Sequence, residues 1–127
     1  MKKNLVFTLF LSFILMYLAG CKKDNKEITC NLSAPVNQAS VGMNIVYTAT
    51  QTGDGTIATL SYVSSAGTIT VLNPSLPWTV TVYLPANTDI TISAAGTVTN
   101  GSLNVEYAGN GGGYTISGKD ACSHQAN

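Results

Sequence analysis

The chain has 127 residues, of which 9% are charged: six are Lys, none is Arg and six are Asp or Glu, so the formal net charge is zero. After residue 31, Lys119 is the only Lys or Arg. A nucleic-acid-binding function is excluded, because it requires a stripe of basic side chains that neutralises phosphates.

The first 20 residues have the features of an export signal. Lys2 and Lys3 form a short basic start, and an apolar run follows at residues 5–16. This run is typical of a signal peptide and is shorter than the roughly 20 residues of a membrane-spanning helix. A Leu-Ala-Gly-Cys lipobox follows at residues 18–21. The sequence predicts a cleaved lipoprotein signal peptide, residues 1–20, and lipidation of Cys21. An uncleaved anchor is disfavoured, because the lipobox lies where cleavage is expected.

Residues 21–43 are predicted to be the lipidated cysteine and a tether. Residues 22–27 are charged or polar throughout, which is typical of a solvated linker. No Asp follows Cys21 directly, which favours the bacterial outer membrane, on its periplasmic side or at the cell surface. Residues 30–44 continue as a polar segment that is either loop-like or holds one edge strand.

Two cysteines remain once Cys21 is assigned to the lipid. Cys30 and Cys122 lie at the two ends of the predicted domain, and an even pair in an oxidising compartment predicts a disulfide. Closing a loop of about 92 residues stabilises a domain by roughly 4–5 kcal/mol. Two free thiols or an intermolecular bridge are the alternatives. A metal site is not expected, because neither cysteine has a partner at ligand spacing.

From residue 44 onward, apolar and polar side chains alternate with the period of a half-buried strand. Turns rich in Gly, Asn, Pro and Ser separate the segments. The pattern predicts strands near residues 45–50, 58–62, 69–71, 78–84, 90–94, 103–107 and 114–116. We expect a small all-β domain at residues 44–123, an immunoglobulin-like antiparallel β-sandwich of about seven strands. Residues 124–127 are expected to form a C-terminal tail.

The residue types of catalytic sites are scarce. His124 is the only histidine and falls in the predicted tail, and the acidic residues of the domain are scattered singly. The sequence therefore predicts neither an enzyme nor a cofactor site. The glycine run at residues 109–113 lacks the lysine and the following helix of a phosphate-binding loop, so a hairpin connection is expected. Asp54 is the single carboxylate of a turn at residues 52–55, which is too few for calcium.

Aromatic residues offer the remaining binding features. We expect Trp78 to lie centrally between the sheets, where replacing it with Ala would cost roughly 3–5 kcal/mol. Tyr83 is expected to face solvent, and with Tyr114 it could form a platform for a glycan. Single exposed aromatic residues are nevertheless common and often have no function.

A more specific pattern lies at residues 75–82, where Leu76, Pro77 and Trp78 open a strand of alternating Thr and Val. Together with Val-Tyr at 46–47 and the segments at 58–62, 90–94 and 101–105, it resembles the MmpS family, small membrane proteins first known from mycobacteria. The resemblance covers about residues 44–107. It implies an extracytoplasmic β-sandwich on an N-terminal membrane anchor, without catalytic residues, that assists lipid-exporting transporters. The family's anchor is typically a transmembrane helix, whereas this chain has a lipobox.

These features predict a non-enzymatic lipoprotein, held in the membrane by its N-terminal lipid, that is an accessory to an envelope transport system. Its partner would be a transporter or another envelope protein. A surface adhesin or glycan-binding module is the alternative, and a purely structural envelope component is a third.

Overall fold

A computed structural model describes residues 25–127. The predicted signal peptide and the predicted lipidation site Cys21 lie outside the described residues. Residues 25–127 form ten β-strands and no helix, which confirms the predicted all-β class.

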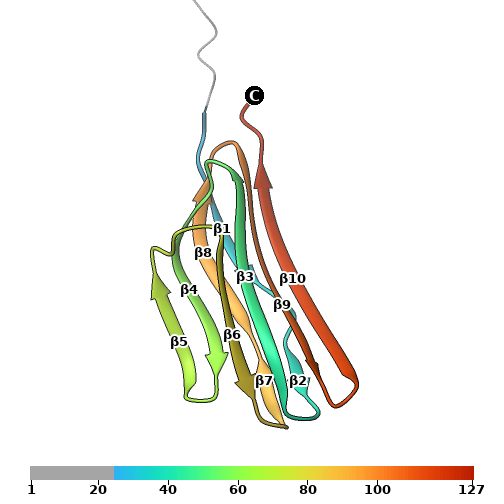
Figure 1. The fold of residues 1–127 in the computed structure, drawn as a ribbon. Coiled ribbons are helices and arrows are strands. Elements are labelled where there is room, and N and C mark those ends of the chain that lie inside the picture. The colour runs from blue at the N-terminus through green and yellow to red at the C-terminus, as the bar shows by residue number, and fades with distance from the viewer. Residues whose placement is uncertain (1–24) are drawn as a thin grey trace, which may run out of the picture.

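Eight of the strands form two four-stranded antiparallel sheets that pack as a sandwich (Figure 1). Sheet I has the order β1-β8-β4-β5, and sheet II has the order β10-β9-β3-β6. The short strands β2 and β7 form a separate pair. The bounds are β1 Ile28–Ser33, β2 Asn37–Ala39, β3 Met43–Gly53, β4 Thr56–Ser64, β5 Gly67–Leu72, β6 Trp78–Leu84, β7 Thr88–Ile90, β8 Ile92–Val98, β9 Gly101–Gly111 and β10 Tyr114–His124.

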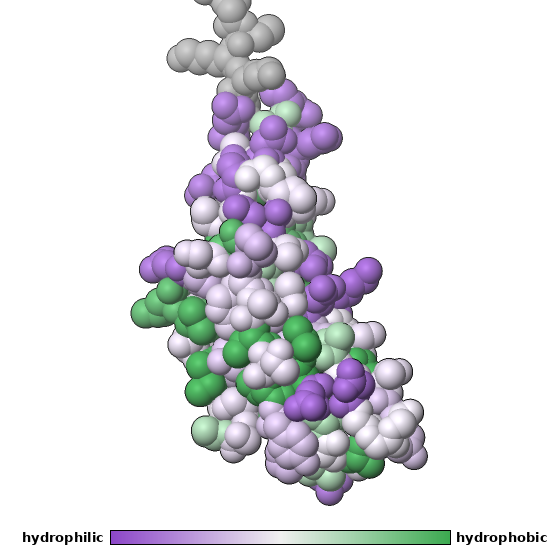
Figure 2. All heavy atoms as spheres, in the orientation of Figure 1, coloured by the Kyte–Doolittle hydropathy of each residue, from purple (hydrophilic) through white to green (hydrophobic). Residues whose placement is uncertain are grey.

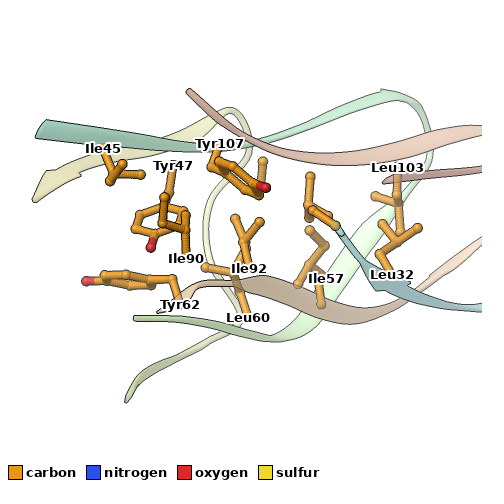
Figure 3. Packing of buried hydrophobic residues seen from close by; sticks show 14 of the residues in the cluster. Leu32, Ile45, Tyr47, Ile57, Leu60, Tyr62, Ile90, Ile92, Leu103 and Tyr107 are labelled. Carbon is orange, nitrogen blue, oxygen red and sulfur yellow. The ribbon is translucent and has the colours of Figure 1, made fainter. Parts of the chain in front are cut away.

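The hydrophobic core lies between the two sheets. Successive side chains of a strand point to opposite faces, so the apolar set of each central strand is buried and the polar set faces outward. Figure 3 shows Tyr47 and Tyr107 of sheet II opposite Leu60 and Ile92 of sheet I. All four side chains are at most 1% exposed. The predicted core faces of β3, β8 and β9 are confirmed.

The alternation predicted for residues 58–62 would place Ala58 inward with Leu60 and Tyr62, and this is wrong for Ala58 because β4 contains a β-bulge. The pairing of β4 with β8 shifts between Ile57 and Thr59, which leaves Ala58 as the extra residue. As a result Ile57 is buried on one side of the bulge and Leu60 on the other, while Ala58 is exposed.

The domain extends beyond the predicted strands at both ends. β1 lies within the segment 21–43 that we predicted as a tether, for which one edge strand from residue 30 onward was left open, and it pairs with β8 at the edge of sheet I. β10 runs through His124, which we predicted to lie in a tail. β10 is a weak sequence signal, because its inward positions include Gly118 and Asp120. β1 has the alternation of a half-buried strand, with Cys30 and Leu32 inward, but it is only six residues long.

The strand order can be compared with that of an immunoglobulin domain, whose sheets are ABED and CFG. The pairs β3–β6 and β4–β8 correspond to B–E and C–F. The flanking strands differ: β1 lies beside β8, in the place of strand G, and β9 lies beside β3, in the place of strand A. Compared with an immunoglobulin domain, the first strand β1 and the last hairpin β9–β10 have therefore exchanged sheets.

Candidate functional site

One side of the sandwich is closed by its first and last strands. The predicted disulfide is confirmed: Cys30 of β1 and Cys122 of β10 are bonded, with their Cα atoms 5.9 Å apart. The backbone N–H of Ser33 donates a hydrogen bond to Oδ2 of Asp120 at 2.9 Å. This bond joins the same two strands three residues further along β1, so the two sheets are linked twice on this side.

The opposite side, between β5 and β6, is open. These two strands are the outer edges of sheets I and II, and their inward side chains, apart from the fully buried Leu84, are only partly buried. Figure 2 shows apolar residues gathered on the face where β5 and β6 lie in Figure 1. We call this surface the β5–β6 seam and define it by Ile69, Val71, Leu76, Trp78, Val80 and Val82.

Trp78 belongs to the seam and does not lie centrally between the sheets, so that prediction is wrong. It pairs with Ala49 at the start of the edge strand β6, where no further strand covers it. The centre of the core is occupied by Tyr47 and Tyr107. A line of aromatic rings joins the two places: the ring centroids of Trp78 and Tyr62 are 5.4 Å apart, and those of Tyr62 and Tyr47 are 5.2 Å apart.

The Leu76-Pro77-Trp78 motif lies at the border of the core. The peptide bond between Leu76 and Pro77 is cis, and the side chains of Leu76 and Trp78 pack against the core while remaining partly exposed. The one distinctive motif of the sequence is thereby part of the seam.

The hydroxyl of Tyr47 is buried without a hydrogen-bond partner. Burial raises the pKa of Tyr47 to about 12, and the neighbouring Tyr107 also raises this pKa. Backbone groups of Thr91 and Val63 are close enough to lower the pKa in part, although they lack the geometry of hydrogen bonds. Tyr47 therefore stays protonated at neutral pH and supplies no proton to chemistry there.

The titratable residues singled out in the sequence support turns. Oδ1 of Asp54 accepts hydrogen bonds from the backbone N–H groups of Thr99 and Asn100, at 3.0 and 2.9 Å. These hydrogen bonds lower the pKa of Asp54 below its ordinary value. Nδ1 of His124 lies 2.7 Å from the carbonyl oxygen of Thr99. Asp54 and His124 thus hold the turn between β8 and β9.

Among residues 25–127, no three His, Cys, Asp or Glu side chains lie together as a metal site would need. The same residues contain no helix with the length and apolar character of a membrane span.

The two tyrosines proposed as a platform are both exposed, Tyr83 by 58% and Tyr114 by 59%. Tyr83 lies on β6 on the outer face of sheet II, and Tyr114 begins β10. The predicted glycine turn at residues 109–113 is shorter than expected. β9 continues to Gly111, and the turn consists of Gly112 and Gly113, whose φ angles are 55° and 82°.

No protein-family model matches the chain, and comparisons with curated proteins and with solved structures gave no match. Two surfaces of the described domain are candidates for binding, the β5–β6 seam and the outer face of sheet II.

Proposed function

We propose that the protein is a non-enzymatic lipoprotein of the bacterial outer membrane, anchored through Cys21, that binds another envelope protein along the β5–β6 seam. In this proposal the bound protein belongs to an envelope transport system, and the domain is its accessory. The observation that carries the proposal is the partly exposed apolar border formed by Leu76, Trp78 and their neighbours. The same motif is the basis of the resemblance to the MmpS family.

The composition of the seam suits a protein partner. Interfaces between proteins are enriched in aromatic residues, and Trp and Tyr often contribute most of the binding energy. Here the partly exposed Trp78 ring contacts the buried Tyr62 ring, so it is held in place by the core and loses little freedom on binding.

The backbone of the seam can also take part. β5 and β6 are edge strands, and each has one side whose backbone N–H and C=O groups face away from its own sheet. Such edges are templates for an added strand. A partner strand beside β6 would place its alternate side chains over Val80 and Val82 and would cover the apolar border.

The position of the seam fits an anchored domain. In Figure 1 the start of β1 and the C-terminus lie at the same end of the sandwich, and β5 and β6 run along its side. A tether before β1 would therefore leave the seam accessible to a protein standing next to the domain in the same membrane or spanning the periplasm.

In-cell photocrosslinking tests the proposal with a matched pair of positions. A photoreactive phenylalanine analogue replaces Val80, which belongs to the seam, or Thr79, its neighbour on the outer face of sheet II. We expect the Val80 variant to capture an inner-membrane exporter or its periplasmic adaptor, identified by mass spectrometry. The Thr79 variant should not capture it.

Capture of the same protein from both positions would contradict binding at the seam. Capture of no envelope protein from Val80, with a correctly folded and membrane-bound variant, would contradict the accessory function. Whether Cys21 is lipidated is measured separately, by mass spectrometry of the mature N-terminus.

A further inference from the structure

The side chain of Tyr83 lies along the outer face of sheet II. Its hydroxyl end lies against Gly42, where an added Cβ would come within 2.0 Å of Oη and 2.9 Å of Cζ. Gly42 is thus the residue that leaves room for this orientation. The aromatic ring remains 58% exposed, so it is an oriented surface ring that is open to a ligand.

Exposed polar residues continue from Tyr83 across the sheet. Tyr83 of β6 is opposite Asn44 of β3, Asn44 is opposite Asn110 of β9, and Asn110 is opposite Thr115 of β10. All of them face solvent. Neighbouring side chains in such a row are about 4.5–5.5 Å apart, which is comparable to the length of one sugar unit in a glycan chain.

A shallow hollow lies beside this row. It has a volume of about 350 Å³, and its floor includes Val46 and Ala108 while Asn110, Thr115 and Ser117 line it with polar groups. Val46 is 40% exposed although it lies in the middle of β3. The volume is at the lower end of the range for small-molecule sites, and an apolar floor with a few polar groups is their usual composition.

The row and the hollow carry no charged side chain. On the outer face of sheet II, Glu106 and Lys119 face each other as a pair of opposite charge, two rows from Asn110 and Thr115 and one row from Ala108 and Ser117 of the hollow. A site without charge is complementary to an uncharged ligand and gives an anionic polysaccharide no attraction.

We propose that this surface, formed by Tyr83, Asn44, Asn110, Thr115 and the adjoining hollow, binds a neutral glycan. A sugar ring has an apolar C–H face. One ring of the glycan chain would stack on Tyr83, and another would contact Val46 in the hollow. Its hydroxyl groups would hydrogen bond to the Asn44 and Asn110 amides, which both donate and accept. The inference is independent of the proposed transport function, because it uses the outer face of sheet II and not the seam.

The test is affinity gel electrophoresis of the full chain, purified in detergent, in gels that contain a neutral polysaccharide (xylan, mannan or laminarin) or an acidic one (alginate). We expect at least one neutral polysaccharide to retard the protein and alginate not to do so. Tyr83→Ala should weaken binding roughly tenfold, as expected for one stacked aromatic contact. Gly42→Ala should also weaken binding, because the added Cβ displaces the Tyr83 side chain.

Tyr114→Ala is the matched control, since Tyr114 is exposed to the same extent but lies outside the row. It should bind like the unchanged protein, and circular dichroism confirms that each variant is folded. The proposal is overturned if no neutral polysaccharide retards the protein, if alginate is the only ligand, or if Tyr83→Ala and Tyr114→Ala weaken binding equally. Failure of this test would leave the crosslinking result at Val80 unaffected.

Discussion

The hydroxyl of Tyr107 donates a hydrogen bond to the carbonyl oxygen of Pro35, 2.7 Å away, and so ties β9 to the segment between β1 and β2. The same hydroxyl accepts a hydrogen bond from Nδ2 of Asn37. Tyr47, its neighbour in the core, has a hydroxyl with no such partner. A comparison of the two tyrosines therefore measures what a hydrogen-bonded buried hydroxyl contributes to stability.

Tyr107→Phe should lower the free energy of unfolding by about 1–3 kcal/mol, because it leaves the Pro35 carbonyl and the Asn37 amide without their partner. Tyr47→Phe should be neutral or stabilising, since it removes a buried polar group that makes no hydrogen bond. Urea unfolding of both variants measures the difference. Equal losses would show that Tyr47 has a partner in solution.

Removal of the disulfide should be the most costly covalent change in the domain. Cys30 and Cys122 are separated by 92 residues, and reducing their bond should cost roughly 4–5 kcal/mol through the restored freedom of the unfolded chain. Unfolding curves with and without a reductant measure this cost. The Cys30→Ala, Cys122→Ala double variant is the control and should be insensitive to the reductant.

Stability should fall at alkaline pH because of Tyr47. Its pKa is about 12 in the folded protein, against an ordinary value of 10.0. Above pH 10 the unfolded chain releases this proton while the folded chain keeps it, so the free energy of unfolding decreases as pH rises through the window from 10 to 12. Tyr47→Phe should remove this part of the alkaline decrease. Urea titrations on both sides of pH 10 make the comparison, and identical pH profiles would refute the assignment.

The location of Trp78 at the seam changes the expected effect of replacing it. Trp78→Ala should cost less than the roughly 3–5 kcal/mol of a fully buried aromatic residue, because part of the ring is already exposed. Leu60→Ala, in the fully buried part of the core, should cost roughly 2–5 kcal/mol. Chemical denaturation of the two variants measures both losses in the free energy of unfolding. A loss for Trp78→Ala within or above the range for buried aromatic residues would show that Trp78 is part of the core.

The sequence predicted those features that depend on local alternation. The inward faces of β3 and β9 follow from their apolar side chains at every second residue, and the disulfide follows from two cysteines at the ends of the domain. β10 was underestimated because its inward positions include Gly118 and Asp120, which give no apolar alternation. β1 does alternate, with Cys30 and Leu32 inward, but it has only six residues and follows a run of charged residues.

Features that depend on pairing between distant segments were not predictable in this way. The residues of a central strand are buried more deeply than those of an edge strand. β6 is an edge strand because it pairs with β3 and with no other strand. Trp78 was assigned to the centre of the core because local alternation does not reveal this pairing. The hollow beside Asn110 likewise requires β3, β9 and β10 to be neighbours, which no single segment reveals.

The bond between the first and last strands also determines how the domain would respond to mechanical load. A pull on the segment before β1 reaches Cys30 after only two residues of that strand, and at Cys30 it divides between β1 and, through Cys122, β10. A partner held on the seam would resist at β5 and β6, on the far side of both sheets. The disulfide closes residues 30–122 into a covalent ring, so such a pull would load β1 and β10 together and could not detach β1 alone beyond Cys30.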